Sequence, residues 1–282
     1  YNLFPAIVAE LDPTRPYSDN SPYSPRVDSQ DVHPNDPDHG THHQWEVWNR
    51  IDYTAYRSEI PRFCSEFGFQ APPAWRTLSD WVHAVEGGPL ASASDPKNDA
   101  NFLLHQKADD GNGKLDRGLA EHVGVPDEFA DWHWATQLNQ ARAVTYAIDH
   151  YRRWWPRTAG AIVWQLNDCW PVTSWAAIDC EERPKPLWYA MRRAFAPRNV
   201  VFASENGILS VVLLNDTDHP WRGELRLSRE QLDGEILATT TVQVNVEPRT
   251  ATPIAVLDAV SHPQDRTIEI VVVRIEGVTR VH

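Results

Sequence analysis

A single carboxylate in an aromatic segment is the residue of this chain best suited to chemistry. Glu66 lies in RFCSEFGFQ, residues 62–70, with Phe63 and Phe67 on either side of it. Burying a carboxylate is costly unless the charge is paired, so the position needs a specific reason. One reason is a structural ion pair, for instance with the nearby Arg62. The other is catalysis, in which the carboxylate attacks a substrate.

Two further segments combine tryptophan with amide and imidazole side chains. They are HGTHHQWEVW, residues 39–48, and WQLNDCWPVTSW, residues 164–175. A tryptophan face suits the CH face of a sugar ring, and amides can orient sugar hydroxyls. A carboxylate can attack or stabilise the oxocarbenium-like centre of a glycoside. Together with Glu66, these segments predict carbohydrate cleavage, although core packing is the simpler interpretation for most of the 13 tryptophans.

Metal binding is the alternative for the histidine-rich segment. His39, His42 and His43 are imidazoles of the kind that zinc accepts, but their spacing is typical of a loop. No thiol or carboxylate pattern completes such a zinc site. The acidic stretch ADDGNGKLDRG, residues 108–118, is reminiscent of a calcium loop but lacks the closing glutamate of an EF-hand. We therefore predict neither a metal site nor a cofactor.

The overall composition is ordinary for a globular protein and argues against polyanionic partners. Of the 282 residues, 41% are hydrophobic and 23% are charged, and the net charge is −13. Nucleic acid and anionic membranes are excluded as partners, because their phosphates would repel such a chain. No apolar run approaches the roughly 20 residues that a membrane-spanning helix needs.

Cysteine and methionine usage bears on location and on the start of the chain. Cys64, Cys169 and Cys180 are an odd number without CxxC spacing, which disfavours a disulfide framework and favours a reducing compartment. We therefore predict a cytoplasmic location. The chain begins with Tyr1 and its single methionine is Met191, so we expect its natural start to be missing.

Predicted strands and helices alternate in the first 197 residues. Strands are expected within 62–70 and 160–168, the second as a buried parallel strand. Helices are expected at 72–83, 127–153 and 185–195 and, as a short one, within 44–60. The first 40 residues have loop composition, and 86–118 are polar, with GG, DP and DGNG. This alternation is typical of a βα-barrel, whose chemistry lies at the carboxyl ends of its strands. Because a complete barrel takes about 250 residues, only strands five to eight are expected in residues 1–197.

Residues 198–282 have a different pattern. Runs such as ILSVVLL, EILATTTVQVNVE and RTIEIVVVRI follow one another at regular spacing, with turn residues between them. They predict an immunoglobulin-like β-sandwich, truncated at its C-terminal end. The fold class expected for the whole chain is therefore α/β plus β, the C-terminal part of a (β/α)8 TIM barrel followed by this sandwich.

Five motifs together resemble the β-mannosidases of glycoside hydrolase family 2. They are DPTRPY (12–17), SPYSP (21–25), HGTHHQWEVW, PRFCSEFGFQAPP (61–73) and WQLNDCWPVTSWAAID (164–179), in the family's order. The resemblance implies retaining hydrolysis of terminal, non-reducing β-D-mannose residues by double displacement, with a β-mannoside or oligosaccharide as substrate. It also implies a TIM barrel flanked by β-sandwich domains, with RFCSEFGF on barrel strand seven and GAIVWQLND on strand eight.

The same resemblance assigns roles to individual residues. Glu66 matches the family's catalytic nucleophile in the SEFG motif. Trp164 matches the aromatic residue that forms the floor of the sugar subsite. The remaining substrate-binding candidates, from the strand-six and strand-eight motifs, are His43, Trp45, Asn167 and Asp168.

The chain departs from the family in one respect that bears on mechanism. The family's acid/base glutamate follows an asparagine upstream of DPTRPY, and residues 1–65 contain no Asn-Glu dipeptide. Retaining glycosidases need two carboxyl groups about 5–5.5 Å apart. We therefore expect a C-terminal fragment that holds the nucleophile and is nearly inert by itself. The alternatives are another family 2 specificity, exo-β-glucosaminidase or β-galactosidase, and a non-catalytic carbohydrate-binding module; the sequence does not indicate an oligomeric state.

Overall fold

The computed structural model describes residues 2–25, 32–205 and 207–282, which form two compact units. The first unit comprises the chain up to Ala147 together with Arg157–Met191. The second unit comprises Ile148–Pro156 together with Arg192–His282. The second unit therefore includes the end of the long helix α6 (Phe129–Arg153), as well as the C-terminal third of the sequence.

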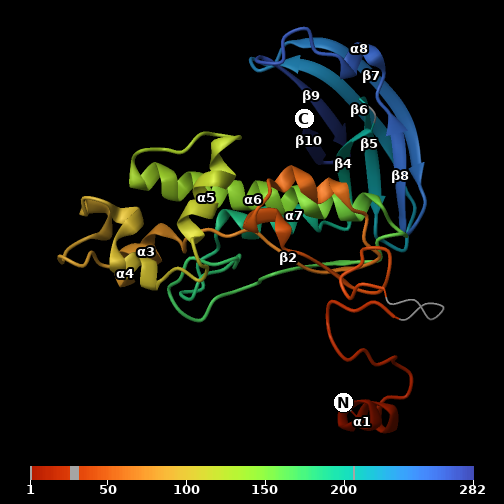
Figure 1. The fold of residues 1–282 in the computed structure, drawn as a ribbon. Coiled ribbons are helices and arrows are strands. Elements are labelled where there is room, and N and C mark those ends of the chain that lie inside the picture. The colour runs from red at the N-terminus through yellow and green to blue at the C-terminus, as the bar shows by residue number, and fades with distance from the viewer. Residues whose placement is uncertain (1, 26–31, 206) are drawn as a thin grey trace. The chain divides into compact units, whose positions relative to one another are not determined.

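A parallel three-stranded sheet lies in the first unit, and Figure 1 labels its middle strand, β2. Its strands are β1 (His42–Gln44), β2 (Cys64–Phe67) and β3 (Ala161–Val163), in the order β1-β2-β3. The strands expected within 62–70 and 160–168 are thus present, parallel and adjacent. The carboxyl ends of parallel strands meet at one edge of a sheet, which is where α/β proteins bind ligands. Closure of such strands into a barrel remains a prediction, because the described sheet has three strands.

Strand β3 is less buried than its apolar sequence predicted. Ile162 is 55% exposed, and Ala161 and Val163 are only partly covered. The reason is its place in the sheet, since β3 is an outer strand with β2 as its one neighbour among the described residues. An apolar sequence indicates that a strand is suited to burial. How much of the strand is buried depends on the elements that pack beside it.

Three helices form close to the limits that the periodicity predicted. They are α3 (Trp75–Trp81), α6 and α7 (Pro186–Ala194). The α6 residue Trp132 stacks on Phe129 at 5.7 Å between ring centroids, and its indole N–H donates to Asp116 at 2.6 Å. The buried cluster around Trp132 contains Leu78, Val82, Leu90, Phe102, Leu115, Leu119, Phe129 and Trp132. None of the helices formed by the described residues is long and apolar enough to cross a membrane.

The polar segment 86–118, for which no helix was predicted, contains two short helices. They are α4 (Ala100–Leu104) and α5 (Gly111–Ala120), with short 3-10 turns before them. Leu115 and Leu119 are one helical turn apart, and both are buried in the cluster just described. The sequence did not indicate these helices, because glycines and charged residues outnumber this apolar pair and conceal its spacing.

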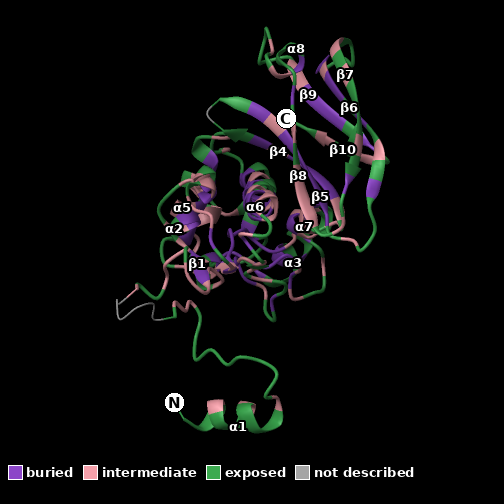
Figure 2. Cartoon of the chain, turned by 90° about the vertical axis from the view of Figure 1, so that its right-hand side faces the viewer, coloured by how far each residue is buried: buried purple, intermediate pink, exposed green. Residues whose placement is uncertain are grey.

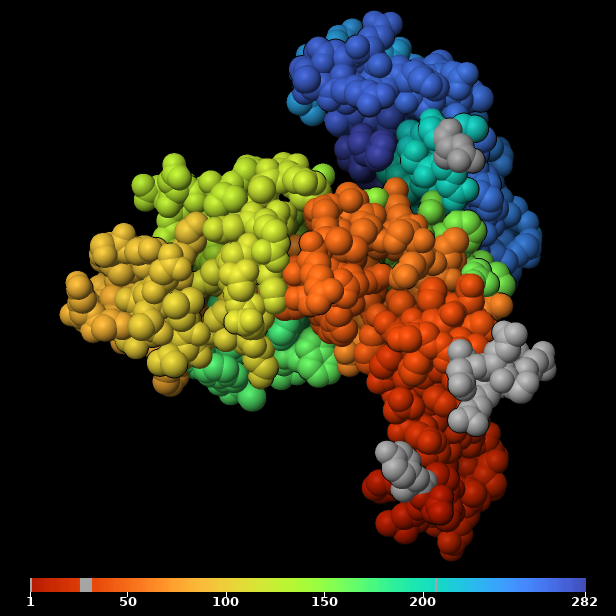
Figure 3. Space-filling model, viewed as in Figure 1, coloured from red at the N-terminus to blue at the C-terminus, as the bar shows by residue number. Residues whose placement is uncertain are grey.

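Two other segments also differ from expectation. Helix α1 (Leu3–Leu11) occupies the start of the region predicted as loop; none of its side chains is buried, and Figure 3 shows it among the red residues. Its sequence, LFPAIVAEL, precedes the proline- and aspartate-rich stretch on which the loop prediction rested. Residues 44–60, expected to hold one short helix, contain α2 (Glu46–Asn49) and a 3-10 helix, η1 (Tyr53–Ser58).

The second unit is a sandwich of two antiparallel sheets, which confirms the β-sandwich prediction. One sheet has the order β10-β9-β6-β7 and the other β4-β5-β8. The strands are β4 (Arg198–Glu205), β5 (Ile208–Asn215), β6 (Trp221–Gln231), β7 (Ile236–Val246), β8 (Thr250–Ala255), β9 (Glu269–Ile275) and β10 (Val278–Val281), and the short helix α8 (Asp258–Ser261) follows β8. Figure 2 shows buried residues along β5, β6 and β9. Trp221 lies in this core and its indole N–H donates to Glu276 at 2.7 Å.

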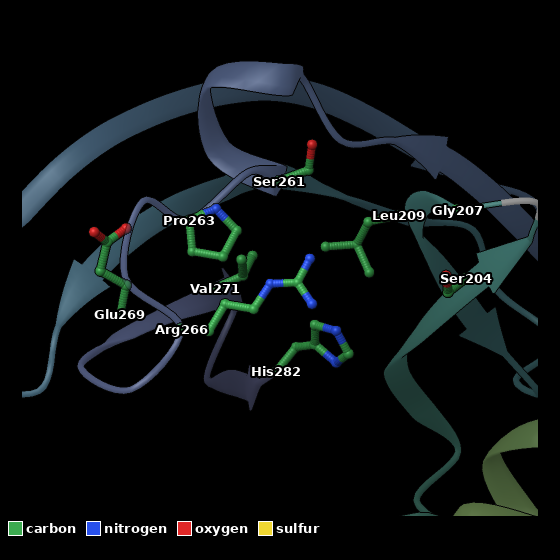
Figure 4. Close-up of a pocket in the computed structure, with 9 residues that line it drawn as sticks. All are labelled: Ser204, Gly207, Leu209, Ser261, Pro263, Arg266, Glu269, Val271 and His282. Carbon is green, nitrogen blue, oxygen red and sulfur yellow. The ribbon is translucent and has the colours of Figure 1, made fainter. Parts of the chain in front are cut away.

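A pocket of about 410 Å³ opens in the second unit (Figure 4). Leu209 and Val271 contribute apolar lining, and Arg266 contributes a guanidinium group. Glu269 also lines the pocket, but its carboxylate already accepts a hydrogen bond from Arg229 at 2.6 Å. The charge that this pocket can offer a ligand is therefore mainly that of Arg266.

Candidate active site

Glu66 lies close to the carboxyl end of β2, and other residues singled out in the sequence surround it along the same edge of the sheet. The pairing of β1 with β2 makes His43 the register partner of Glu66. Trp45 follows β1 directly, and Trp164 follows β3 directly. The parallel sheet thus brings four of the six predicted site residues to one edge from distant positions in the sequence.

Two side chains hold the Glu66 carboxylate. The indole N–H of Trp45 donates to Oε2 at 2.9 Å, and Nδ1 of His43 lies 3.3 Å from the same oxygen. The Glu66 side chain is 30% exposed, so a substrate can reach it, whereas the flanking Cys64 and Phe67 are fully buried. A carboxylate that is oriented by neighbouring groups and still open is suited to attack an electrophilic carbon.

Irregular pairing of β2 explains why the aromatic and polar residues around Glu66 alternate imperfectly. In a regular strand, successive side chains point to opposite faces. The pairing of β2 shifts register once against β1 and once against β3. As a result, Ser65 and Glu66 are both partly exposed between the buried Cys64 and Phe67.

Trp45 belongs to a cluster of three tryptophans with edge-to-face contacts. The ring centroids of Trp45 and Trp175 are 5.8 Å apart, and those of Trp48 and Trp175 are 4.9 Å apart. Trp48 has a φ of 71°, a left-handed conformation that costs free energy for a bulky residue. It is only 8% exposed, and the Lys114 ammonium lies 4.9 Å from its ring centroid. Both Trp48 and Trp175 occur in the sequence motifs, but no local pattern showed that they would pack against Trp45.

His43 is fixed through both its backbone and its ring. Its amide N–H donates to Oδ1 of Asn35 at 2.6 Å, and Nδ2 of Asn35 donates to its carbonyl at 2.9 Å. The ring Nε2 lies 2.9 Å from Oγ of Ser21. Burial lowers the pKa of His43 below its usual value; the charge of Glu66 opposes this shift and that of His42 reinforces it. The lowered pKa favours the neutral imidazole at pH 7.

The other two histidines of the segment have different partners. Nδ1 of His39 lies 3.0 Å from a carboxylate oxygen of Asp36, and Nε2 of His42 lies 3.1 Å from one of Glu59. In residues 2–25, 32–205 and 207–282, no three His, Cys, Asp or Glu side chains converge as a metal site requires. The zinc and calcium alternatives thus gain no support from the geometry.

Trp164, the residue after β3, is 42% exposed. Its backbone N–H donates to the carbonyl of Phe67 at 2.8 Å. Its own carbonyl lies against Gly68, where a Cβ would come within 2.1 Å of the oxygen. Gly68 is therefore required for the close approach of the segments that follow β2 and β3. An exposed indole beside the strand of Glu66 suits stacking on a sugar ring.

Asp168 and Asn167, the remaining predicted site residues, differ in their surroundings. Asp168 is 9% exposed and accepts hydrogen bonds from Oγ of Ser174 at 2.6 Å and Nε2 of Gln165 at 3.1 Å. Burial raises the pKa of Asp168, whereas these hydrogen bonds and the charge of Lys185 oppose the rise. Asn167 is exposed. Of the two, Asn167 is therefore the residue that a substrate can reach.

Lys185 is a fully buried lysine that acts on the same segment. Its Nζ donates to the carbonyl of Ala71 at 3.1 Å. Burial lowers the pKa of Lys185 to about 7, against the opposing charges of Asp168 and Asp179. Asp179 in turn accepts a hydrogen bond from Oγ1 of Thr77 at 2.6 Å. These buried groups connect the segment after β3 to the one that follows β2.

Arg62 does not form an ion pair with Glu66. Its Nε donates to the carbonyl of Asp38 at 3.2 Å. The contacts of the Glu66 carboxylate given by the described residues are those with Trp45 and His43. The proximity of Arg62 and Glu66 in the sequence therefore does not translate into a contact.

Comparison with known proteins agrees with the motifs. The family described as Mannosidase Ig/CBM-like domain matches residues 207–279, which is most of the sandwich. Beta-mannosidase B of Aspergillus niger is 32% identical over 202 residues, covering 69% of this chain and 22% of that protein. Beta-mannosidase B of Thermothelomyces thermophilus is 31% identical over 202 residues, covering 69% of this chain and 23% of that protein. The chain thus spans less than a quarter of the length of these relatives.

Two solved structures share the fold. The β-D-mannosidase of Dictyoglomus thermophilum superposes with a TM-score of 0.83 at 30% identity, covering 96% of this chain and 32% of that one. The exo-chitosanase CsxA of Amycolatopsis orientalis superposes with a TM-score of 0.59 at 19% identity, covering 82% of this chain and 29% of that one. At this identity the match shows a similar fold alone. The resemblance to β-mannosidases that the motifs indicated is therefore confirmed.

Proposed function

We propose that this chain carries the nucleophile of a retaining exo-β-mannosidase of glycoside hydrolase family 2. The observation that supports it most directly is the Glu66 carboxylate, which is partly exposed and oriented by Trp45 and His43 at the carboxyl end of a parallel strand. Similarity to β-mannosidases over most of the chain supports the sugar class. Residues 1–197 are proposed to be the later part of a TIM barrel, and residues 198–282 an immunoglobulin-like domain.

In this proposal, Glu66 attacks the anomeric carbon of a terminal β-mannoside and forms a glycosyl-enzyme, which water then hydrolyses. Trp45 and His43 both contact Oε2, so Oε1 is the oxygen directed to the sugar carbon. The exposed indole of Trp164 forms the floor under the ring, and the exposed amide of Asn167 binds a hydroxyl. Asp168 is proposed to hold the segment in place from inside, since Ser174 and Gln165 already donate to it.

The second carboxyl group, which protonates the leaving oxygen, is proposed to come from residues outside these 282. Residues 1–65 contain no glutamate preceded by asparagine, and the chain spans 22% of the length of the Aspergillus niger relative. A retaining mechanism requires the two carboxyl groups together. The 282-residue chain is therefore expected to be nearly inactive by itself.

Covalent trapping of the full-length protein tests the proposal. A 2-deoxy-2-fluoro-β-mannosyl fluoride reacts with a retaining nucleophile but is released slowly, because fluorine destabilises the oxocarbenium-like transition state. We expect peptide mapping to find one fluoromannosyl group, bound to Glu66. Glu66→Gln should not be labelled, whereas the control Glu46→Gln, which changes an exposed carboxylate near Trp45, should be labelled as in the wild type.

The reagent's sugar distinguishes the remaining possibilities. Faster labelling by a gluco- or galacto-configured analogue would assign another specificity within the same mechanism. If none of the manno-, gluco- and galacto-configured reagents labels the protein but mannose binds measurably, the protein is a carbohydrate-binding module and not a glycosidase.

A further inference from the structure

Two serine hydroxyls connect the ring of His43 to the backbone of β1. Oγ of Ser21 lies 2.9 Å from Nε2 of His43 and 2.7 Å from Oγ of Ser65, and Ser65 is within reach of the carbonyl of His42 at 3.3 Å. Ser21 comes from the segment before β1, whereas Ser65 lies on β2 next to Glu66. We refer to Ser21 and Ser65 as the hydroxyl pair. The carbonyl of His42 can only accept, so when Ser65 donates to it, Ser65 cannot also donate to Ser21. Oγ of Ser21 also lies 3.2 Å from Oγ1 of Thr41.

The surroundings of the two ring nitrogens determine which one carries the proton when His43 is neutral. Nδ1 lies 3.3 Å from Oε2 of Glu66, and an ionised carboxylate can only accept. A proton on Nδ1 is therefore attracted by Glu66, whereas a lone pair there would be repelled. Nε2 must then accept, and the donor beside it is the hydroxyl of Ser21. In this state the single hydrogen of Ser65 points to Ser21, at 2.7 Å, and no longer to the more distant carbonyl of His42, at 3.3 Å. Ser21 in turn donates to His43.

The same atoms also suit the protonated ring. If His43 gains a proton, Nε2–H donates to Ser21, Ser21 donates to Ser65, and Ser65 donates to the carbonyl of His42. Only the hydroxyl hydrogens rotate, and no heavy atom has to move. The titratable groups that act on His43 are Glu66 on β2 and, on its own strand, the neighbouring His42.

We propose that Ser21 is a positioning residue that fixes the neutral tautomer of His43 with its proton on Nδ1, facing Glu66, and that Ser65 supports Ser21 in this role. The proposal deepens the proposed function and rests on it, because a fixed N–H beside Oε2 keeps the nucleophile in one orientation. Burial of His43 agrees with the proposal, because burial favours the neutral ring. Only the neutral ring has two tautomers, whereas the protonated ring carries a hydrogen on both nitrogens.

The tautomer can be measured directly by NMR on the 282-residue chain labelled with 15N in its histidine rings. His43→Gln identifies the His43 signals by their disappearance. In the wild type, we expect Nδ1 to have the shift of a protonated nitrogen and Nε2 that of an acceptor. In Ser21→Ala, we expect the ratio of the two tautomers to move about fivefold toward the Nε2–H form, as one lost hydrogen bond predicts. Ser65→Ala should move it in the same direction by less.

Two control variants make the result specific. Ser21→Thr keeps a hydroxyl and should retain the wild-type tautomer. Ser18→Ala removes a hydroxyl of the same segment that donates to the carbonyl of Asn20, and it should leave His43 unchanged. An unchanged tautomer in both Ser21→Ala and Ser65→Ala would overturn the proposal, as would an equal shift in Ser18→Ala. If Ser21→Ala does not fold, Ser65→Ala decides alone.

The measurement requires no substrate, so its outcome can be separated from that of covalent trapping. A wild-type tautomer that depends on Ser21, in a protein that no sugar reagent labels, would support the hydrogen-bond assignment and reject the proposed function. Labelling of Glu66 in a protein whose His43 tautomer ignores Ser21 would support the proposed function and reject the role of Ser21.

Discussion

Gly68→Ala should destabilise the first unit, because the added methyl group has no room. The new Cβ would lie 2.1 Å from the carbonyl oxygen of Trp164, whereas real Cβ contacts essentially never fall below 3.0 Å. The segments after β2 and β3 must therefore separate by about 0.9 Å. A shift of that size along the hydrogen bond from Trp164 N–H to the Phe67 carbonyl, now 2.8 Å, would lengthen it beyond hydrogen-bonding distance.

The magnitude follows from these two effects. Overpacking of this kind costs about 1–3 kcal/mol, and a lost backbone hydrogen bond costs about 1 kcal/mol. We therefore expect Gly68→Ala to lower the free energy of unfolding by about 2–4 kcal/mol. The assay is urea unfolding at 25 °C, followed by tryptophan fluorescence and circular dichroism and compared at equal m-values.

Gly223→Ala is the matched control. Gly223 also lies in a strand, β6, but its added Cβ would meet the Glu276 side chain at 3.2 Å, a contact that a shift of a few tenths of an ångström relieves. Because alanine also reduces the freedom of the unfolded chain, this variant should change stability by less than about 1 kcal/mol. A loss at Gly68→Ala that is no larger than the one at Gly223→Ala would refute the argument from close approach.

Other predictions concern titration and the site. Burial lowers the pKa of Lys185 from 10.5 to about 7, so between these values the unfolded chain binds a proton that the folded chain does not. The free energy of unfolding should consequently rise with pH by up to about 1.4 kcal/mol per unit, and urea titrations at pH 7.5 and 8.5 should show this slope reduced in Lys185→Met. Trp45→Phe removes a hydrogen bond to a carboxylate, worth about 1.5–3 kcal/mol, and should slow fluoromannosyl labelling of Glu66 in the full-length protein at least tenfold; an unchanged rate would contradict the assigned contact. Trp164→Ala should weaken mannose binding by calorimetry about tenfold with little change in stability, and equal affinity would exclude the indole from the subsite.

The sequence predicted the parts of the fold that repeat over short distances. The spacing in α6 extends over many turns, and the strands of the sandwich recur at regular intervals, so both could be read from local periodicity. Helix α5 could not, because Leu115 and Leu119 are a single apolar pair among glycines and charges. The exposure of Ile162 could not either, since it depends on how many strands flank β3.

The candidate site shows the same division. Glu66 stood out because a carboxylate within an aromatic run is unusual, and motif order linked it to Trp45 and Trp164. Ser21 lies 22 positions from its hydrogen-bonding partner His43, and no local pattern relates them. The position of Trp48 could not be predicted for another reason. Its backbone adopts a left-handed conformation that is unfavourable for tryptophan and is maintained only because tertiary packing compensates.

The outer strands of the small parallel sheet also determine how the chain can be handled in solution. The side-chain amide of Asn35 forms hydrogen bonds with the N–H and the carbonyl of His43 and thereby protects the unpaired edge of β1. The far border of β3 has no such cover among the described residues, and Ile162 adds an apolar side chain there. An open strand of this kind is a template for a strand from another molecule, so concentrated preparations should self-associate through β3, and a charged replacement of Ile162 is the first change to make for crystallisation or NMR.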